Sequence, residues 1–427
     1  MILPSRALPP RGGSRPINHS LTCFNHVRIP PTALLGSIKK PRDPRASFFS
    51  AIYRVAVGTI ALSSLGVPSL QVASYIAARY SLRRHVVDMS GISKPIMSFQ
   101  TQKQPILIAV AQAFVLEAMH KQAVEWFMDP ALDPRVRHAV ATVHKVAMIQ
   151  AAQAANFVLG DRCGAQGLFE ANQLSAMHVC SLSSSQLCVV YATPSPSLTC
   201  VELPLPRVTC WASLSVGIRS VHLTVLMLHL RPAGLASELL LGRYALEPPR
   251  YPDCHLAQHE KGLFSELRAS LAATTSHRSE TYNREVLPRS LPLIQAIGHR
   301  IAYEAARSAQ IDGPLLDLFE AASMLQDEAW YVERLGMTRA ELWEREARAL
   351  EAVFPRLAEY LARMDVASYV VAPIVSDEKW KQFVSSLQVF GETSRGWGAG
   401  ILGPLLDCNV SPTQLQVASR GRVRTML

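Results

Sequence analysis

Ligand patterns for a metal ion are missing from the sequence. There is no C-x-x-C pair and no H-E-x-x-H motif, and the thirteen histidines are scattered along the chain. Because zinc is bound by ligands at short, regular spacings, we predict no metal site. Eight cysteines in 427 residues are too few for a disulfide framework, which excludes a small domain held by disulfides.

Charged and aromatic residues are scarce. Only 18% of the residues are charged and 7% are aromatic, and no stretch interleaves basic with aromatic side chains as RNA-binding modules do. We therefore predict no nucleic-acid partner. The net charge of +10 arises mostly in the N-terminal part, from Lys39, Lys40, Arg42, Arg45, Arg79, Arg83 and Arg84. Such a basic face is usually solvated, but it leaves phosphate-bearing ligands open.

Long uncharged apolar runs are also missing. No run in the regular parts of the chain reaches the roughly 18 residues that a membrane-spanning helix requires, so we predict no membrane span. The N-terminal MILPSRALPPRGG lacks the apolar centre of a signal peptide. The C-terminal Thr425-Met426-Leu427 is not a peroxisomal signal of the S-K-L type.

Hydrophobic residues make up 49% of the chain, which is typical of a globular protein, and 427 residues are enough for two or three domains. Residues 1–22 are rich in proline, glycine, serine and arginine, so we expect them to be irregular. Phe24, Val27 and Ile29 then alternate with polar residues, which predicts a short strand that ends at Pro30.

From residue 46 the pattern becomes helical. Four long helices with few charges are predicted, with a loop through Gly91 and Pro95 after the second, at Phe48–Leu65, Ser69–Arg84, Gln104–Phe127 and His138–Leu159. Four long helices joined by short loops suggest a bundle.

The last third of the chain is more charged and again helical. Helices are predicted at Leu293–Ala309 and Pro314–Met324. Thr338 and Glu341 form a capping-box pattern. The helix after the box has one apolar face, made of Leu350, Val353, Phe354, Leu357 and Leu361.

The end of the fourth predicted helix carries a glycine-containing stretch, DRCGAQGLFEANQL, at Asp161–Leu174. Its glycines are Gly164 and Gly167. Glycine at such a place either caps the helix or lets the backbone approach a ligand or another chain closely. The residues alone leave both interpretations open.

Three stretches together resemble the acyl-CoA oxidase and acyl-CoA dehydrogenase family. Ile76–Gln104, with IAARYSLRRHV and KPIMSFQTQKQ, is similar to its flavin-binding helix and loop. Cys23–Gly36, CFNHVRIPPTALLG, resembles the last strand of its β-domain, and Asp161–Leu174 resembles its Q-x-x-G-G-x-G turn. The three follow the family's order, and the resemblance covers roughly Leu21–His178 and resumes near Ala233.

The resemblance implies a mainly α fold, an acyl-CoA oxidase-like C-terminal four-helix bundle with a second helical domain. Residues 1–45 would be irregular and hold a short remnant of the β-domain. Residues 46–245 would form the flavin-binding bundle, and residues 246–427 the oxidase-type C-terminal helical domain. Ordinary dehydrogenases of the family lack that extra domain, so the resemblance favours an oxidase.

The resemblance also implies FAD as cofactor and a homodimer. Arg84 matches the arginine that reaches the FAD pyrophosphate of a neighbouring subunit, and Gln100 matches a glutamine that supports the same cofactor. Gly164 and Gly167 match glycines that let the backbone approach FAD. The chain departs from the family at Asp161, where Gln or Glu is usual, and at Ala165, where the family has glycine.

The segment from Ala171 to Leu230 lacks helical periodicity, and its only charged residues are Glu202, Arg207 and Arg219. The family's catalytic glutamate lies in an E-G-[DTE] motif that is missing here. A membrane-associated insert or a long buried loop would also give a segment with few charges. The Ser, Thr and Pro content argues against a span, and buried loops of this length are uncommon.

The missing motif can lie in another reading frame. Leu198–Ser215 can be encoded by bases that, regrouped, read D-M-R-G-A-A-I-A-E-G-D-M-L-G-L-S, with the glutamate codon split across Pro206 and Arg207. The codon for Val179 begins with GT and that for Ser197 can begin with AG, the usual ends of an intron. We therefore hypothesise an unspliced intron, expect residues 179–232 to be aberrant and poorly ordered, and assign no catalytic residue to the chain as written.

The resulting expectation is an acyl-CoA oxidase-like flavoprotein. Such an enzyme desaturates an acyl-CoA thioester to trans-2-enoyl-CoA with FAD and O2, giving H2O2, in fatty-acid β-oxidation or acyl-derived secondary metabolism. Without its catalytic glutamate and the family's N-terminal domains, this chain looks truncated and inactive alone. The alternative is a catalytically inactive helical interaction or dimerisation protein. The resemblance suggests a peroxisomal location, and otherwise a cytoplasmic one.

Overall fold

The computed structural model describes a large part of the chain, namely residues 5–9, 20–24, 26–28, 30–33, 39–87, 89–179, 234–274, 276 and 279–389. Apart from residue 179, the segment 179–232 predicted to be aberrant lies outside these residues. The frame-shifted glutamate position at Pro206 and Arg207 therefore also lies outside them.

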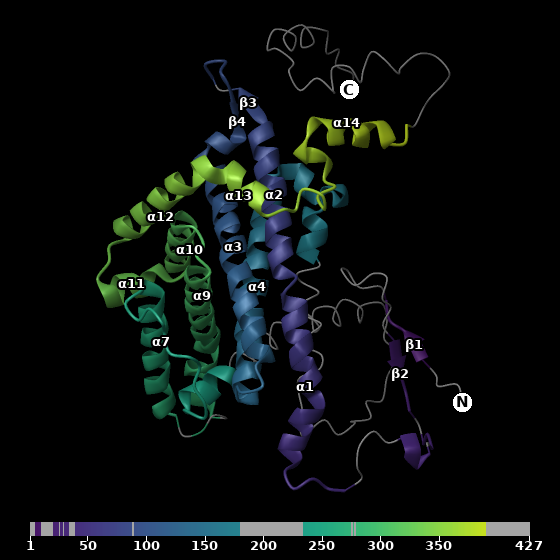
Figure 1. The fold of residues 1–427 in the computed structure, drawn as a ribbon, viewed down its shortest axis with the longest axis vertical. Coiled ribbons are helices and arrows are strands. Elements are labelled where there is room, and N and C mark those ends of the chain that lie inside the picture. The colour runs from purple at the N-terminus through teal and green to yellow at the C-terminus, as the bar shows by residue number, and fades with distance from the viewer. Residues whose placement is uncertain are drawn as a thin grey trace, which may run out of the picture.

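Four long helices run side by side or end to end at the centre of the molecule (Figure 1), α1 (Pro44–Ser63), α2 (Gly66–Arg83), α3 (Gln100–Met128) and α4 (Pro134–Arg162). All four were predicted, with bounds within about one turn. At the start of α4, the Asp133 side chain accepts the N–H of Arg135 at 2.8 Å, and Pro134 occupies the first helical position.

Small residues let these helices approach one another closely. Buried alanines recur through α2, α3 and α4, among them Ala73, Ala77, Ala109, Ala113, Ala139 and Ala152. Gly66 at the start of α2 lies against α4, since a Cβ there would be only 2.9 Å from the carbonyl oxygen of Met148. Tight packing of small residues therefore fixes where each helix lies along its neighbour.

The second helical domain packs directly on the bundle, with α9 and α10 against α3 (Figure 1). One continuous hydrophobic core includes residues of both parts. The helices of this domain are α7 (His255–Ala272), α8 (Glu280–Glu285), α9 (Ser290–Ser308), α10 (Gly313–Met324), α11 (Glu328–Leu335), α12 (Arg339–Val353), α13 (Leu357–Arg363) and α14 (Asp377–Ser386).

The capping box before α12 is confirmed. The Glu341 carboxylate accepts the N–H of Thr338 at 2.7 Å, and the Thr338 hydroxyl accepts the N–H of Glu341 at 3.2 Å. The predicted helices at Leu293–Ala309 and Pro314–Met324 correspond to α9 and α10. The apolar face from Leu350 to Leu361 is divided between α12 and α13, because a short 3-10 turn at Phe354–Arg356 separates them.

The described strands are short and pair in two antiparallel hairpins. β1 (Ser5–Ala7) pairs with β2 (Ser20–Thr22), and β3 (His85–Val87) pairs with β4 (Ser93–Pro95). The predicted strand from Phe24 to Ile29 is wrong. β2 ends before it, and His26 has a left-handed φ of 47° that interrupts an extended backbone.

One described helical stretch, Ala56–Arg83, is long and apolar enough to cross a membrane by length and composition. Half of its most apolar window is buried inside the structure. Core helices of soluble proteins share this composition, so the predicted absence of a membrane span stays a prediction.

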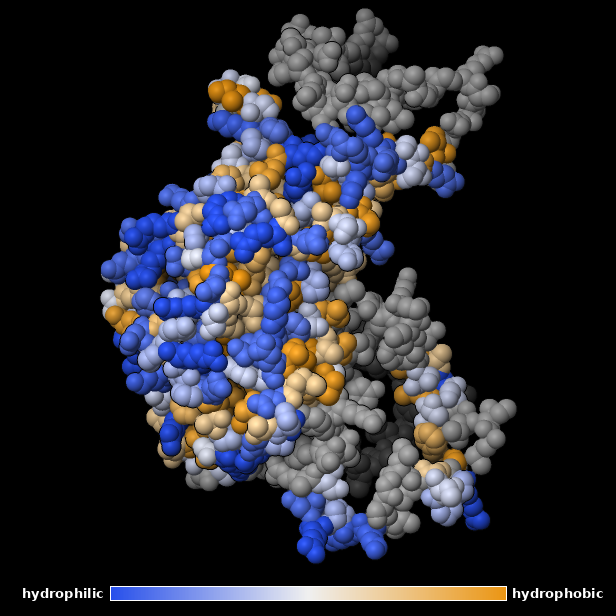
Figure 2. All heavy atoms as spheres, viewed as in Figure 1, coloured by the Kyte–Doolittle hydropathy of each residue, from blue (hydrophilic) through white to orange (hydrophobic). Residues whose placement is uncertain are grey.

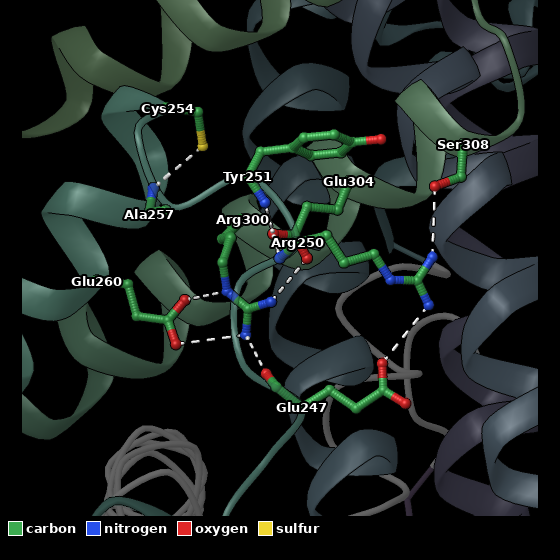
Figure 3. Close-up of polar contacts among 9 residues, drawn as sticks. All are labelled: Glu247, Arg250, Tyr251, Cys254, Ala257, Glu260, Arg300, Glu304 and Ser308. Carbon is green, nitrogen blue, oxygen red and sulfur yellow. Dashed lines mark hydrogen bonds and ion pairs between the residues drawn. The ribbon is translucent and has the colours of Figure 1, made fainter.

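A buried ion cluster joins the second helical domain to the loop before it (Figure 3). Arg300 of α9 is 1% exposed, and its guanidinium lies between the carboxylates of Glu260 in α7 and Glu304 in α9. Glu304 also accepts the backbone N–H groups of Arg250 at 2.8 Å and Tyr251 at 3.4 Å. One arginine thereby holds two helices and, through Glu304, the loop.

Arg300→Met is expected to destabilise the protein by about 3–5 kcal/mol, because two buried carboxylates then lose their cation. Glu260→Gln keeps Arg300 paired with Glu304. The pKa of Glu260 is raised, chiefly by burial and against the opposing effect of Arg300, so removing this charge should cost only about 1–2 kcal/mol at neutral pH. Urea unfolding measures both losses, and equal losses would contradict this description of the cluster.

Candidate functional site

The end of α2, the start of α3 and the end of α4 meet at one end of the bundle. Gln102 joins all three, because its Nε2 donates to Ser81 Oγ and to the carbonyl oxygen of Arg162, both at 2.8 Å. The Arg162 guanidinium in turn donates to the carbonyl oxygen of Thr101 at 3.1 Å. We call the region formed by residues 80–102 and 160–173 the bundle end.

Arg84 is the first residue after α2. Its backbone N–H donates to Tyr80 at 2.8 Å, and its carbonyl oxygen accepts the N–H of Ile96 at 2.8 Å. Its guanidinium is exposed, and no carboxylate pairs with it in the part of the chain that the structure describes. The neighbouring Arg83, in contrast, forms an ion pair with Asp377 at 2.5 Å. Arg84 is therefore available to an external anion.

Gln100 is the first residue of α3, and its side chain is exposed. No described hydrogen bond involves that side chain. The glutamine that braces the site is Gln102, which sequence reasoning missed. The signal was present in the run Phe99-Gln100-Thr101-Gln102, but the family resemblance selected the first glutamine of the pair.

The two predicted glycines have different surroundings. Gly164 follows the last residues of α4 with a φ of +56°, so the helix-cap interpretation is confirmed. A Cβ at Gly164 would meet nothing within 4 Å, whereas a Cβ at Gly167 would lie 2.2 Å from the carbonyl oxygen of Gly160. Gly167 therefore lets the turn Gly164–Leu168 pack on α4, and Gly164 faces open space.

The bundle end has two halves, residues 80–102 and residues 160–173, and Tyr80 interacts electrostatically with both. Burial raises the pKa of Tyr80, Arg84 lowers it, and Cys163 raises it further. Tyr80 therefore lies within electrostatic reach of the end of α2 and of the glycine turn. Burial also raises the pKa of the Cys163 thiol to about 12, so this thiol is neutral and a poor nucleophile near pH 7.

Large apolar side chains are exposed around this end. Phe99 is 47% exposed at the start of α3, and Leu168 and Phe169 in the glycine turn are 80% and 58% exposed. The β3–β4 hairpin adds Val87 and Met89, and Figure 2 shows apolar residues at its tip. Such grouping on a soluble surface usually marks a binding site. The bundle end thus combines exposed apolar groups with an arginine that lacks a carboxylate partner.

A second polar group lies inside the bundle. Ser63 Oγ is 2.8 Å from Nδ1 of His144, and Nε2 of His144 is 3.1 Å from Nδ1 of His120. Burial, with a contribution from His120, lowers the pKa of His144 to about 3, so this ring is neutral near pH 7. His120 lies about 27 Å along α3 from Gln102 at 1.5 Å per residue. The group therefore connects α1, α3 and α4 away from the bundle end.

A cleft of about 570 Å³ lies in the second helical domain, between the start of α7 and α12. Its charged and polar lining includes His255, Gln258, Glu341, Glu344, Arg345 and Arg348. Glu341 is already used in the capping box, and Glu344 lies 3.8 Å from Arg348. The lining therefore carries both signs of charge and indicates no single ligand chemistry. Within the described residues, no group of three or more His, Cys, Asp or Glu side chains could hold a metal ion.

The fold is that of acyl-CoA oxidases. Arabidopsis thaliana acyl-CoA oxidase 1 superposes on 94% of this chain and 67% of its own length, with a TM-score of 0.66 and 14% identity. Acyl-CoA oxidase 1 from Yarrowia lipolytica covers 95% of this chain and 65% of its own, with a TM-score of 0.69 and 12% identity. Acyl-CoA oxidase-1 of Caenorhabditis elegans, complexed with FAD and ATP, covers 95% and 64%, with a TM-score of 0.65 and 14% identity.

This chain spans about two thirds of the length of these oxidases. At 12–14% identity the likeness establishes an acyl-CoA oxidase-like, mainly helical fold and no more. No protein-family profile matches the sequence, and no curated protein matches it.

Gly167→Ala is expected to destabilise the protein by about 2–4 kcal/mol, because the new methyl group overlaps a main-chain carbonyl that cannot move without shifting α4. Gly164→Ala has open space and only the cost of a left-handed alanine, about 1 kcal/mol. Thermal and urea unfolding compare the two variants. A larger loss for Gly164→Ala would contradict the assigned roles.

Proposed function

We propose that this chain is the helical part of an acyl-CoA oxidase-like flavoprotein and that its bundle end contacts FAD. The observation that carries the proposal is that two features occur at the same end of the bundle. One is Arg84, an exposed arginine that has no carboxylate partner among the described residues, and the other is the open glycine turn at Gly164. Both occur on an acyl-CoA oxidase-like fold.

The residues at the bundle end suit a flavin dinucleotide. The planar guanidinium of Arg84 matches the geometry of phosphate oxygens. The open space at Gly164 allows the backbone to approach a ligand without a clash. Exposed Phe99 and Phe169 offer apolar surface for a ring system. Gln100 supplies an exposed amide that can hydrogen-bond the same ligand.

The proposed reaction is desaturation of an acyl-CoA thioester between Cα and Cβ, with O2 reduced to H2O2. FAD, when bound, supplies the electron acceptor for this step. A carboxylate must take the α-proton, and burial that raises its pKa makes it a better base. We assign this role to the glutamate encoded across Pro206 and Arg207 in the other frame. The chain as written would then bind FAD but would not desaturate acyl-CoA.

The chain spans about two thirds of the length of the comparable oxidases. We propose a homodimer with acyl-CoA as substrate and a peroxisomal location, in keeping with the oxidase-like fold. A second candidate function is a catalytically inactive helical interaction protein. The exposed Leu168, Phe169 and Val87 favour it, because they also suit a protein partner.

Arg84→Gln is expected to weaken FAD binding by roughly 10- to 30-fold, the effect of losing a charged hydrogen-bonding partner. Arg79→Gln is the matched control, because it removes the same charge from an exposed position in α2 five residues earlier and should change affinity less than about twofold. Quenching of FAD fluorescence measures both. Equal weakening would indicate general electrostatic attraction, and no saturable FAD binding by the unaltered chain would favour the interaction protein.

Sequencing of the transcript over codons 165–245 tests the assignment of the base. We expect a spliced message that lacks the codons of residues 179–196 and reads A-E-G-D in frame. A mature message that retains these codons would show that the glutamate is truly absent, and the catalytic proposal would then give way to the interaction protein.

A further inference from the structure

The segment between α13 and α14 lies against the outer side of α2. Residues 366–376, which we call the strap, include the 3-10 turn Pro373–Val375 and lead into α14 (Figure 1). Val370 and residues 372–375 of the strap are buried, whereas Tyr369 and Val371 are exposed. The continuous buried stretch at 372–375 shows that this part of the strap packs on the bundle.

Gln173 attaches the strap to the element that follows the glycine turn. Its Oε1 accepts the backbone N–H groups of Val371 at 2.8 Å and Ala372 at 3.2 Å, and its Nε2 donates to the carbonyl oxygen of Tyr369 at 3.3 Å. Gln173 itself has a left-handed φ of 65° directly after the 3-10 turn Glu170–Asn172. One amide thus satisfies three backbone groups of a segment almost 200 positions away.

Arg83 attaches the strap's end to the end of α2. Its guanidinium donates to the carbonyl oxygen of Ile374 at 3.2 Å and to the Asp377 carboxylate at 2.6 Å. Lys379 of α14 donates to the carbonyl oxygen of Val370, which joins the start of α14 back to the strap. The residue next to Arg83 is Arg84, so this anchor fixes the point from which Arg84 extends.

The same strap therefore holds both halves of the bundle end from outside. Gln173 holds the half that contains the glycine turn, because the turn Gly164–Leu168 packs on the turn Glu170–Asn172. Arg83 holds the half that contains Arg84. Gln102 joins the same two halves from inside. Side-chain hydrogen bonds therefore join the two halves of the bundle end on both sides.

We propose that the strap positions the two halves of the bundle end for flavin binding and that Gln173 is its positioning residue. The inference rests on the proposed function, because it assigns the strap a role in the affinity of that site. Preorganisation of this kind increases affinity by removing the cost of ordering the site on binding.

The test compares Gln173→Ala with the full chain. Alanine and glutamine have a similar backbone cost in the left-handed region, so the variant mainly removes the side-chain amide. We expect amide hydrogen exchange at Val371 and Ala372 to accelerate about tenfold, and exchange in residues 164–172 to accelerate as well. We also expect the Kd for FAD to rise about five- to tenfold. Gln382→Ala on the exposed face of α14 is the matched control and should change none of these.

Gln173→Glu separates positioning from general destabilisation. The carboxylate retains acceptors for Val371 and Ala372, so exchange and FAD affinity should return most of the way to the original values. If Gln173→Ala accelerates exchange only in the strap and leaves both residues 164–172 and the FAD Kd unchanged, the inference is wrong and the proposed function stands. If the unaltered chain binds no FAD, the proposed function fails, and unchanged exchange in residues 164–172 would overturn the positioning role separately.

Discussion

Close packing around α3 is the constraint on which the rest of the structure depends. This helix contacts α2 and α4 within the bundle and α9 and α10 of the second helical domain, so its surface is covered along most of its length. Residues such as Ala109 and Ala113 keep the neighbouring helices near, and a larger side chain would push them apart. The bundle and the second domain consequently share one core, and neither can shift without disturbing α3.

The polar features of the fold follow from this packing. Because packing fixes the position of each helix along its neighbours, the ends of α2, α3 and α4 lie together. The side-chain amide of Gln102 in α3 can then donate hydrogen bonds to Ser81 in α2 and to Arg162 in α4. Packing leaves the bundle end uncovered, where Arg84, the open turn at Gly164 and exposed aromatic side chains lie. A helical bundle whose end carries both polar and apolar groups is a suitable scaffold for a cofactor that itself supplies the redox chemistry.

Local patterns were sufficient to predict the four bundle helices and part of the second helical domain, but not how the helices meet. Helical periodicity predicted the four long helices and α9 and α10, and the T-x-x-E pattern predicted the cap at Thr338. The strand at Phe24 failed because alternation over a few residues is weak evidence, and the β3–β4 hairpin was missed because its strands have three residues each.

The candidate site was predicted in part. The resemblance selected Arg84, Gln100, Gly164 and Gly167, and the structure places all four at one end of the bundle. It did not select Gln102 or Gln173, since their partners are 21 to 199 positions away in the sequence and only the folded chain brings them together. Gly167 also proved to serve packing against Gly160, a role that the motif does not distinguish from ligand approach.

Photolabelling with 8-azido-FAD tests most directly whether the bundle end is a flavin site. The purified chain would be irradiated with the probe and digested, and the labelled peptides identified by mass spectrometry, with excess FAD as competitor. We expect adducts in residues 80–102 or 160–173 that FAD suppresses. Labelling that FAD does not suppress, or that falls only on the cleft between α7 and α12, would contradict it.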